Sequence, residues 1–427
     1  MKKYISIALA LTMVLALFAG CGGSKAPAET QAPAETQAPA ANAPAAAETQ
    51  APAEAPAEAV AVKIGFIFLH DENSTYDLNF MNAAKEACDK LGVESLMRTN
   101  IPETSACYEA AADLVDAGCN IVFADSFGHE PYMIQAAQEF PEVQFCHATG
   151  TQAHVLGLDN YHHAFAAIYE GRYLAGVAAG LKLNEMIEAG QFTAEEAKMG
   201  YVGAYTYAEV VSGYTSFYLG AKSICPSVTM DVTFTGSWYD ETAEKEAANK
   251  LIEGGCKLIS QHADSMGAPT ACENAGVPNV SYNGSTVDAC PNTFIVSSRI
   301  NWAPYFEYII NCVANGEEIA ADWTGNIATG SVELSDVNEQ AAAAGTAEKI
   351  AEVKAALEDG SLKVFDTTTF TYNGAALESF MADVDTDPAY EGDTEVVVDG
   401  AVLESEFRSA PYFNLTIDGI NLLDTAF

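Results

Sequence analysis

Between residues 62 and 363, short apolar or β-branched segments alternate with segments of helical periodicity, and no other feature of the chain restricts its fold as strongly. The first unit begins with residues 62–69, an apolar run that predicts a buried strand. A polar loop follows at residues 70–77, and apolar residues at helical spacing then predict a helix that ends at Gly92. Elements in this order build a parallel sheet with helices packed on it.

The same pattern starts again at Met199, so the chain contains two successive α/β units. We therefore expect two similar lobes rather than one large sheet, with the cleft between them as the ligand site. The other predicted strands are residues 94–98, 120–124, 143–147 and 155–158 in the first unit, and 199–204, 229–234, 257–261, 279–282 and 293–296 in the second. Helices are predicted at residues 105–117 and 131–140.

After Val364 the segments become short and rich in Thr, Asp and Gly. Two β-branched segments flank Asp399-Gly400, a pair that favours a tight hairpin turn. We therefore expect residues 364–427 to form a small β-rich C-terminal extension, to which the sequence assigns no function.

The chain is strongly acidic, with 59 Asp and Glu against 19 Lys and Arg among 427 residues, a net charge of −40. This charge repels phosphate backbones and anionic headgroups, so we expect neither nucleic-acid binding nor electrostatic adsorption to a membrane. The nine cysteines after Cys21 show no C-x-x-C spacing and have mostly apolar neighbours. They are predicted to be buried core thiols rather than disulfides or zinc ligands.

The N-terminus has the features of an export signal. Lys2 and Lys3 precede an apolar run, and residues 17–21 resemble a bacterial lipobox, whose cysteine is acylated. We expect residues 1–20 to be a signal peptide and Cys21 to carry a lipid anchor in the cell membrane; the alternative is an ordinary secretory signal. Residues 21–60, rich in Ala, Pro, Glu and Thr, predict a disordered tether.

The loops that follow the predicted strands are rich in aromatic and carboxylate side chains and contain no lysine. Because ligands of α/β sheets bind at the carboxyl ends of strands, these loops should surround the ligand. Their composition suits a flat, neutral or donor-rich ring and suits an anion poorly. His162 and His163 are adjacent and do not face each other on a helix, so we expect no metal site, and we expect no cofactor. His147 and His262 are predicted to hydrogen-bond backbone carbonyls at strand ends.

Seven segments carry a resemblance to a known family: VKIGFI (62–67), IVFADSFG (121–128), FCHATG (145–150), YEGRYLAG (169–176), GSWYD (236–240), QHADS (261–265) and NWAPY (301–305). In this order they resemble the basic membrane lipoproteins, substrate-binding components of ABC importers related to purine-nucleoside receptors. The resemblance implies an α/β type I periplasmic-binding-protein fold, in which three crossovers join two Rossmann-like lobes. On this basis we expect an N-terminal lobe at residues 61–195 and 301–325, and a C-terminal lobe at residues 196–300 and 326–363.

The resemblance also implies roles for individual residues. Tyr76 is expected to stack on a purine base, Asp71 or Asn73 to reach the edge of that base, and Asp264 to offer a carboxylate from the second lobe. The other expected ligand contacts are Ser126, Phe127, Tyr205, Trp238, Asn283 and Trp302.

Each assignment has a structural alternative. Tyr76 could pack at a helix entry, Asp264 could cap a helix, and Trp238 or Trp302 could lie in a lobe core. The chain also departs from the family pattern, because Asn73-Ser74 stand where adenine-binding relatives usually carry Gly-Trp, and Asn283 stands where many members have Asp.

We interpret the chain as a lipid-anchored binding protein that captures a purine nucleoside or nucleobase and delivers it to an ABC permease, without catalysing a reaction. A flavin or sugar ligand and a signalling receptor are the alternatives. A nucleoside hydrolase is a weaker rival, because the chain lacks the Asp cluster after the first strand, a G-x-S-x-G motif and a P-loop.

Overall fold

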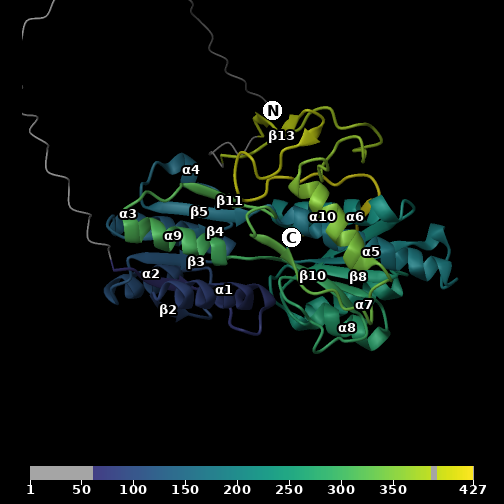
Figure 1. Cartoon of the computed structure of the whole chain (residues 1–427), viewed down its shortest axis with the longest axis horizontal. Coiled ribbons are helices and arrows are strands. Elements are labelled where there is room, and N and C mark those ends of the chain that lie inside the picture. The colour runs from purple at the N-terminus through teal and green to yellow at the C-terminus, as the bar shows by residue number, and fades with distance from the viewer. Residues whose placement is uncertain (1–60, 386–391, 427) are drawn as a thin grey trace, which may run out of the picture. The chain divides into compact units, whose positions relative to one another are not determined.

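The computed structural model describes residues 61–385 and 392–426, which form two α/β units, each built on its own sheet (Figure 1). The expected signal peptide, the lipidated Cys21 and the tether lie outside the described residues. Among the helices of the described residues, none combines the length and the apolar character that crossing a bilayer demands.

The first sheet has six strands in the order β11-β5-β4-β3-β1-β2, and every neighbouring pair is parallel. Its strands are β1 (Lys63–Ile67), β2 (Glu94–Arg98), β3 (Ile121–Ala124), β4 (Gln144–Ala148), β5 (Tyr161–Ala166) and β11 (Asp322–Gly325). The helices between them are α1 (Thr75–Leu91), α2 (Ser105–Asp116), α3 (Glu130–Glu139) and α4 (Ala153–Leu156).

The second sheet has seven strands in the order β12-β10-β9-β8-β6-β7-β17, and only the β10–β12 pair is antiparallel. Its strands are β6 (Lys198–Gly203), β7 (Thr229–Phe234), β8 (Leu258–His262), β9 (Asn279–Tyr282), β10 (Phe294–Ile300), β12 (Val332–Leu334) and β17 (Ile420–Leu422). The helices of this part are α5 (Ile168–Glu188), α6 (Ala208–Ile224), α7 (Glu241–Glu253), α8 (Gly267–Ala275) and α10 (Thr346–Glu358).

The two sheets share one topology. The first five strands of each unit lie in the order second, first, third, fourth, fifth, which is the flavodoxin-like doubly wound arrangement. In such sheets the ligand crevice opens between the first and third strands, at their carboxyl ends. The crevices therefore lie at β1/β3 and at β6/β8.

The chain crosses between the sheets three times: through α5, between β10 and α9 (Ala303–Asn315), and between β11 and β12. This is the type I periplasmic-binding-protein fold that the sequence predicts. The exact lobe boundaries stay a proposal, since α5 begins at the end of the first sheet but packs on α6 and β10 of the second.

One buried cation links α5 to the second sheet. The guanidinium of Arg172 is fully buried and donates hydrogen bonds to Ser260 Oγ in β8 at 2.8 Å, to the Tyr201 hydroxyl in β6 at 3.1 Å, to the Ser281 carbonyl in β9 at 3.2 Å and to Ser298 Oγ in β10 at 3.3 Å. A single side chain thereby fixes one helix to four adjacent strands.

Most predicted elements have the expected type and place, and residues 229–234 and 279–282 match their strands residue for residue. The strand predicted at residues 155–158 is wrong. These residues lie in and just after α4, where Gly157 adopts a left-handed conformation with φ 66°, and the strand follows at Tyr161–Ala166. All nine cysteines of the described residues are buried and unpaired, which confirms their predicted role as core thiols.

The C-terminal extension contacts both sheets. It contains the short strands β13 (Met381–Ala382), β14 (Thr394–Glu395), β15 (Val397–Val398) and β16 (Ala401–Val402). The predicted hairpin is confirmed, because β15 and β16 pair across Asp399 and Gly400, both with positive φ as a type I′ turn demands. The Ser409 amide donates to Asp322 of β11 at 2.8 Å, whereas β17 completes the second sheet beside β7.

Helices α5 and α6 touch backbone to backbone. A Cβ atom at Gly176 would overlap the carbonyl oxygen of Phe217, and one at Gly220 would overlap that of Tyr173. The two helices can approach this closely only while both positions are glycine.

We therefore predict that Gly176→Ala lowers the free energy of unfolding by about 3 kcal/mol, because the helices must separate to admit the methyl group. Thermal or urea unfolding measures the loss. Gly284→Ala is the matched control, since its new Cβ would lie at ordinary contact distance, 3.4 Å from Thr75. Equal stability of the two variants would contradict the close contact between α5 and α6.

Candidate ligand-binding site

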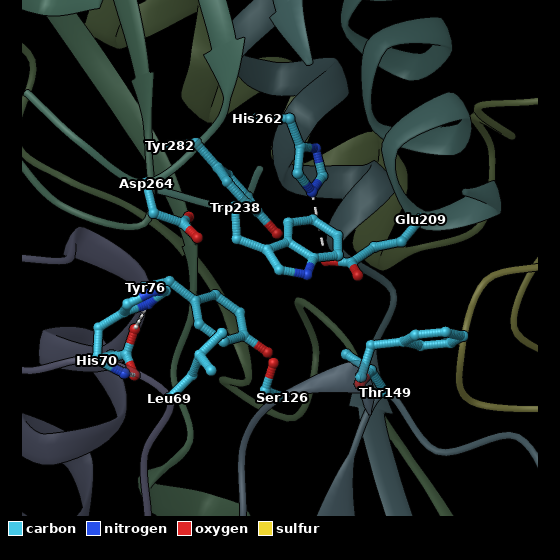
Figure 2. A pocket seen from close by; sticks show the side chains of 12 residues that line it. Leu69, His70, Tyr76, Ser126, Thr149, Glu209, Trp238, His262, Asp264 and Tyr282 are labelled. Atoms are coloured by element: carbon cyan, nitrogen blue, oxygen red, sulfur yellow. Dashed lines mark hydrogen bonds and ion pairs between the residues drawn. The ribbon is translucent and has the colours of Figure 1, made fainter. Parts of the chain in front are cut away.

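A pocket lies where the carboxyl ends of β1 and β3 face those of β6 and β8, and its empty space, including space open to solvent, is about 360 Å³. The first sheet and its loops contribute Leu69, His70, Tyr76, Asp77, Ser126, Phe127 and Thr149, and the second contributes Glu209, Trp238, His262, Asp264 and Tyr282. Figure 2 shows their side chains converging from both sides.

Two aromatic rings project into the pocket from opposite sheets (Figure 2). Tyr76 comes from the first turn of α1, where its hydroxyl donates to the Asp125 carbonyl at 2.8 Å and its ring packs edge-on against Phe80. Trp238 follows β7 and packs edge-on against Tyr205, with ring centroids 5.1 Å apart. Both rings are held in place, which suits them to stack on a planar ligand.

Asp264 presents a buried carboxylate to this space. The residue is 4% exposed, and its side chain accepts no hydrogen bond from any residue that the structure describes. Burial raises the pKa of Asp264 well above its usual range, and the charges of Asp77, Glu244 and Glu209 raise it further. A buried carboxylate without a protein donor is an acceptor available to a ligand N–H or O–H.

Tyr282 adds a second unpaired group. Its hydroxyl is buried without a hydrogen-bond partner in the described chain, and Figure 2 shows it directed toward Trp238. Since most buried polar atoms have a partner, this hydroxyl and the Asp264 carboxylate are sites where a ligand would complete the hydrogen bonding.

A hydrogen-bond chain leads from the buried cation to the pocket wall. Arg172 donates to the Tyr201 oxygen, and that hydroxyl lies 3.3 Å from Nδ1 of His262. Nε2 of His262 lies 3.3 Å from a carboxylate oxygen of Glu209. Because the Tyr201 oxygen accepts from Arg172, the Tyr201 hydroxyl can donate its own proton to Nδ1 of His262. Nδ1 is then an acceptor, so the ring proton of neutral His262 lies on Nε2 and is donated to Glu209.

His262 is neutral in this arrangement. Burial lowers the pKa of His262, and the hydrogen bond and charge of Glu209 oppose that shift only in part. The expected carbonyl bond of His262 is therefore wrong, since this ring bonds side chains instead. For His147 the expectation is confirmed, because its Nε2 lies 2.7 Å from the Ser126 carbonyl.

The structure brings together five of the ten ligand contacts that the sequence predicts. These are Tyr76, Ser126, Phe127, Trp238 and Asp264. Tyr205 lies behind Trp238 and stacks on Tyr207, so it supports the pocket wall without lining it.

Four predicted contacts do not line this pocket. Asp71 and Asn73 bond each other at the surface, where the Asn73 side chain donates to Asp71 at 2.8 Å. Asn283 adopts φ 64° and lines a separate, open pocket beside Asn79. Trp302 is 1% exposed and stacks on Phe80 in the core, so the alternative of a core tryptophan describes its position.

Sequence reasoning did not select several pocket residues, namely Leu69, His70, Asp77, Thr149, Glu209, His262 and Tyr282. Most of them lie in the loops that follow the predicted strands. Their place in these loops was the only sequence evidence that they could contact a ligand. Thr149 also has φ 66°, which is unfavourable for a β-branched residue. Backbone strain of this kind is common at functional sites, but it cannot be recognised from the amino-acid sequence.

The lobes touch across the pocket. The Thr75 amide and hydroxyl both donate to the Asp264 carbonyl, at 3.0 and 3.1 Å. Phe127 and Tyr207, from opposite lobes, pack with ring centroids 5.0 Å apart. The structure therefore shows the cleft in a closed arrangement.

A cluster of His154, His163 and Asp322 lies elsewhere and has the composition of a metal site. Its facing atoms already lie close to one another or to the extension: His154 Nδ1 is 3.2 Å from His163 Nε2, and His163 Nδ1 is 3.3 Å from Ser409 Oγ and 2.8 Å from an Asp322 oxygen. His154 Nε2 bonds the Val384 carbonyl at 2.9 Å. We interpret this cluster as a hydrogen-bond chain that fastens the C-terminal extension to the first sheet.

Residues 67–363 match the family described as Bmp, the PnrA-like ABC transporter substrate-binding proteins. The chain is 32% identical over 250 residues to a purine-binding protein of Brucella abortus, across 57% of this chain and 67% of that relative. It is 31% identical to a putative ABC transporter glucose-binding protein of Haloferax volcanii, across 49% of this chain and 50% of the relative. The ABC transporter nucleoside-binding protein BmpA of Lactococcus lactis is 24% identical, across 46% and 54%.

The chain therefore spans about two thirds of the first relative and about half of the other two. Among solved structures, an ABC transporter solute-binding protein of Aeropyrum pernix superposes with a TM-score of 0.61 at 17% identity, over 71% of this chain and 93% of that chain. This likeness supports the fold. The chain belongs to the Bmp family of PnrA-like ABC transporter substrate-binding proteins.

Proposed function

We propose that the protein binds a purine nucleobase or nucleoside in the pocket between its lobes. The observation that carries the proposal is the buried Asp264 carboxylate, which lacks a protein donor and faces the rings of Tyr76 and Trp238. Purines combine a flat aromatic face with ring N–H and amino donors, so stacking and hydrogen bonding would be satisfied together. Relatives named for purine and nucleoside binding support the same ligand class.

Binding in this pocket requires the lobes to move. Because Thr75 bonds Asp264 across the cleft, a ligand enters only after these contacts open, and closure then buries it. Substrate-binding proteins of ABC importers work outside the cytoplasm and deliver their ligand to a permease. No chemical step enters this proposal.

A sugar is the second candidate, because one relative is named as a putative glucose-binding protein. Its hydroxyls could bond Asp264 and Glu209, but the two opposed aromatic rings favour a planar ligand. A binding screen that includes both classes separates them.

We predict that purines or their nucleosides raise the melting temperature of the protein from which bound ligand has been removed. A ligand at about 100 times its dissociation constant stabilises the native state by about 2.7 kcal/mol. Tyr76→Ala should lower the affinity at least about tenfold through lost stacking, and Asp264→Asn should do the same by replacing an acceptor with a donor.

The matched controls are Tyr108→Ala and Asp113→Asn, which change the same residue types on α2, outside the pocket. Calorimetry should give them wild-type affinity. Stabilisation by glucose alone, or purine affinity that survives both pocket substitutions, would contradict the proposal.

A further prediction concerns the proton on His262, which holds the Glu209 carboxylate in the pocket wall. Nitrogen NMR of histidine-labelled protein should show the Nε2–H tautomer at neutral pH. Tyr201→Phe removes the donor to Nδ1 and leaves that nitrogen without a partner, so purine affinity should fall about fivefold, whereas the Nε2–H tautomer should persist because Glu209 still accepts its proton. Phe192→Tyr serves as a control far from this chain of bonds. An Nδ1–H tautomer in the wild type would refute the assigned network.

Membrane anchoring through Cys21 is part of the proposal, supported by the lipobox-like residues 17–21. We predict that the protein made in a lipoprotein-processing bacterium partitions into detergent and that its N-terminal peptide carries an acylated Cys21. Cys21→Ser should abolish both properties, whereas Cys88→Ser changes a core thiol and should abolish neither. An unmodified mature N-terminus in mass spectrometry would exclude the anchor.

A further inference from the structure

The C-terminal extension touches both lobes at two points that are close together in the chain. Glu404 accepts a hydrogen bond from the Ser212 hydroxyl of α6, in the second lobe, at 2.5 Å. Five residues later, the Ser409 amide donates to Asp322 of β11, in the first lobe, at 2.8 Å. Residues 404–409 therefore run from one lobe to the other, and we call them the bridge.

Both ends of the bridge are buried, and each is held by a second contact. The Glu404 carboxylate also accepts a hydrogen bond from the Ser405 hydroxyl. At the other end, the Ser409 hydroxyl lies 3.3 Å from Nδ1 of His163 in β5. Releasing either end would leave buried polar groups without a partner, which is unfavourable in a protein interior. The two ends therefore act as anchors.

The bridge passes beside the cleft. Its residue Arg408 lines a pocket together with Phe127 and Thr149 of the first lobe and with Tyr207 and Glu209 of the second. Three of these residues, Phe127, Thr149 and Glu209, also line the ligand pocket. The bridge thus joins the lobes close to the place where they must separate to admit a ligand.

The length of the bridge limits the separation of its anchors. A fully extended chain spans about 3.3–3.6 Å per residue, so the backbone from Glu404 to Ser409 reaches at most about 18 Å. A hinge motion that needs a larger separation must first break one anchor. The free energy of that step opposes wide opening, whereas a smaller opening leaves both anchors intact.

We propose that the bridge is a strap that limits how far the two lobes open. The family match ends at residue 363, so the strap belongs to a segment beyond the matched region. With both anchors in place, the lobes open partly and close again over a short path. With one anchor broken or the strap lengthened, they separate further. This role does not depend on which ligand the cleft binds.

Spin labels on opposite lobes measure the opening directly. Lys85 of α1 and Glu246 of α7 are exposed, and Lys85→Cys with Glu246→Cys places one label on each lobe. The full chain also carries Cys21→Ser, and its nine other native cysteines are buried. Pulsed electron paramagnetic resonance, after removal of bound ligand, gives the distribution of distances between the labels. Because no ligand takes part, failure of this test would leave the proposed purine function untouched.

Two changes weaken the strap in different ways. Four glycine or serine residues inserted between the exposed Glu406 and Phe407 lengthen it by about 13 Å and keep both anchors. Ser212→Ala removes the hydrogen bond to the second lobe. Each change should move the distribution of distances by several ångströms toward a wider opening.

Each change has a matched control. The same insertion between Asn373 and Gly374 lengthens an exposed turn of the extension outside the strap. Ser216→Ala alters the same helix, but the Ser216 hydroxyl donates to the Ser212 and Gly213 carbonyls of α6. Both controls should keep the wild-type distribution.

Thermal unfolding verifies that each variant is folded, and Ser212→Ala keeps the test valid if the insertion is not tolerated. Wild-type distances in the folded strap variants would overturn the proposal. An equal shift in the matched controls would also overturn it, because the change in opening would then not come from the strap.

Discussion

The buried guanidinium of Arg172 is the interaction on which the second half of the molecule depends. It bonds groups from β6, β8, β9 and β10, so it fixes the position of α5 against the strands whose ends form the pocket. The described chain offers Arg172 no directly paired carboxylate. Its charge is stabilised by serine, tyrosine and carbonyl oxygens, and a chain of hydrogen bonds links it through Tyr201 and His262 to Glu209. Removing any donor or acceptor from such a network leaves its neighbours unsatisfied in a low-dielectric interior.

This arrangement also explains how a protein with a net charge of −40 can keep several carboxylates in one cleft. Glu209 receives a hydrogen bond from neutral His262, and Asp77 receives one from Ser74 at 2.6 Å. Asp264 has no such compensation, and burial raises the pKa of this carboxyl. Burying a carboxylate without a hydrogen-bond donor is unfavourable, and a donor group of a ligand would offset this cost. The pocket should therefore bind ligands that donate hydrogen bonds most tightly.

The alternating pattern was sufficient to predict the doubly wound lobes, because buried parallel strands and amphipathic helices leave distinct periodicities. It failed at residues 155–158, where apolar residues belong to α4, while the true strand carries His162 and His163 inside the sheet. Individual pocket residues were harder to predict. At a strand end, neighbouring side chains point to opposite faces, so Tyr282 enters the pocket and Asn283 lines another space. Trp302 stands in a family-like segment, yet only its three-dimensional stacking on Phe80 shows that it belongs to the core.

The C-terminal extension changes how the two lobes can behave. It bonds the first sheet through Ser409 and Asp322, and it ends as β17 on the edge of the second sheet. Any opening of the cleft must therefore change the path of the chain between these two attachments, in addition to the three crossovers of the fold. The same segment places Arg408 and Ala410 in the lining of a pocket that shares Phe127, Thr149 and Glu209 with the pocket between the sheets. One continuous segment therefore both connects the two sheets and contributes to the surface beside the cleft.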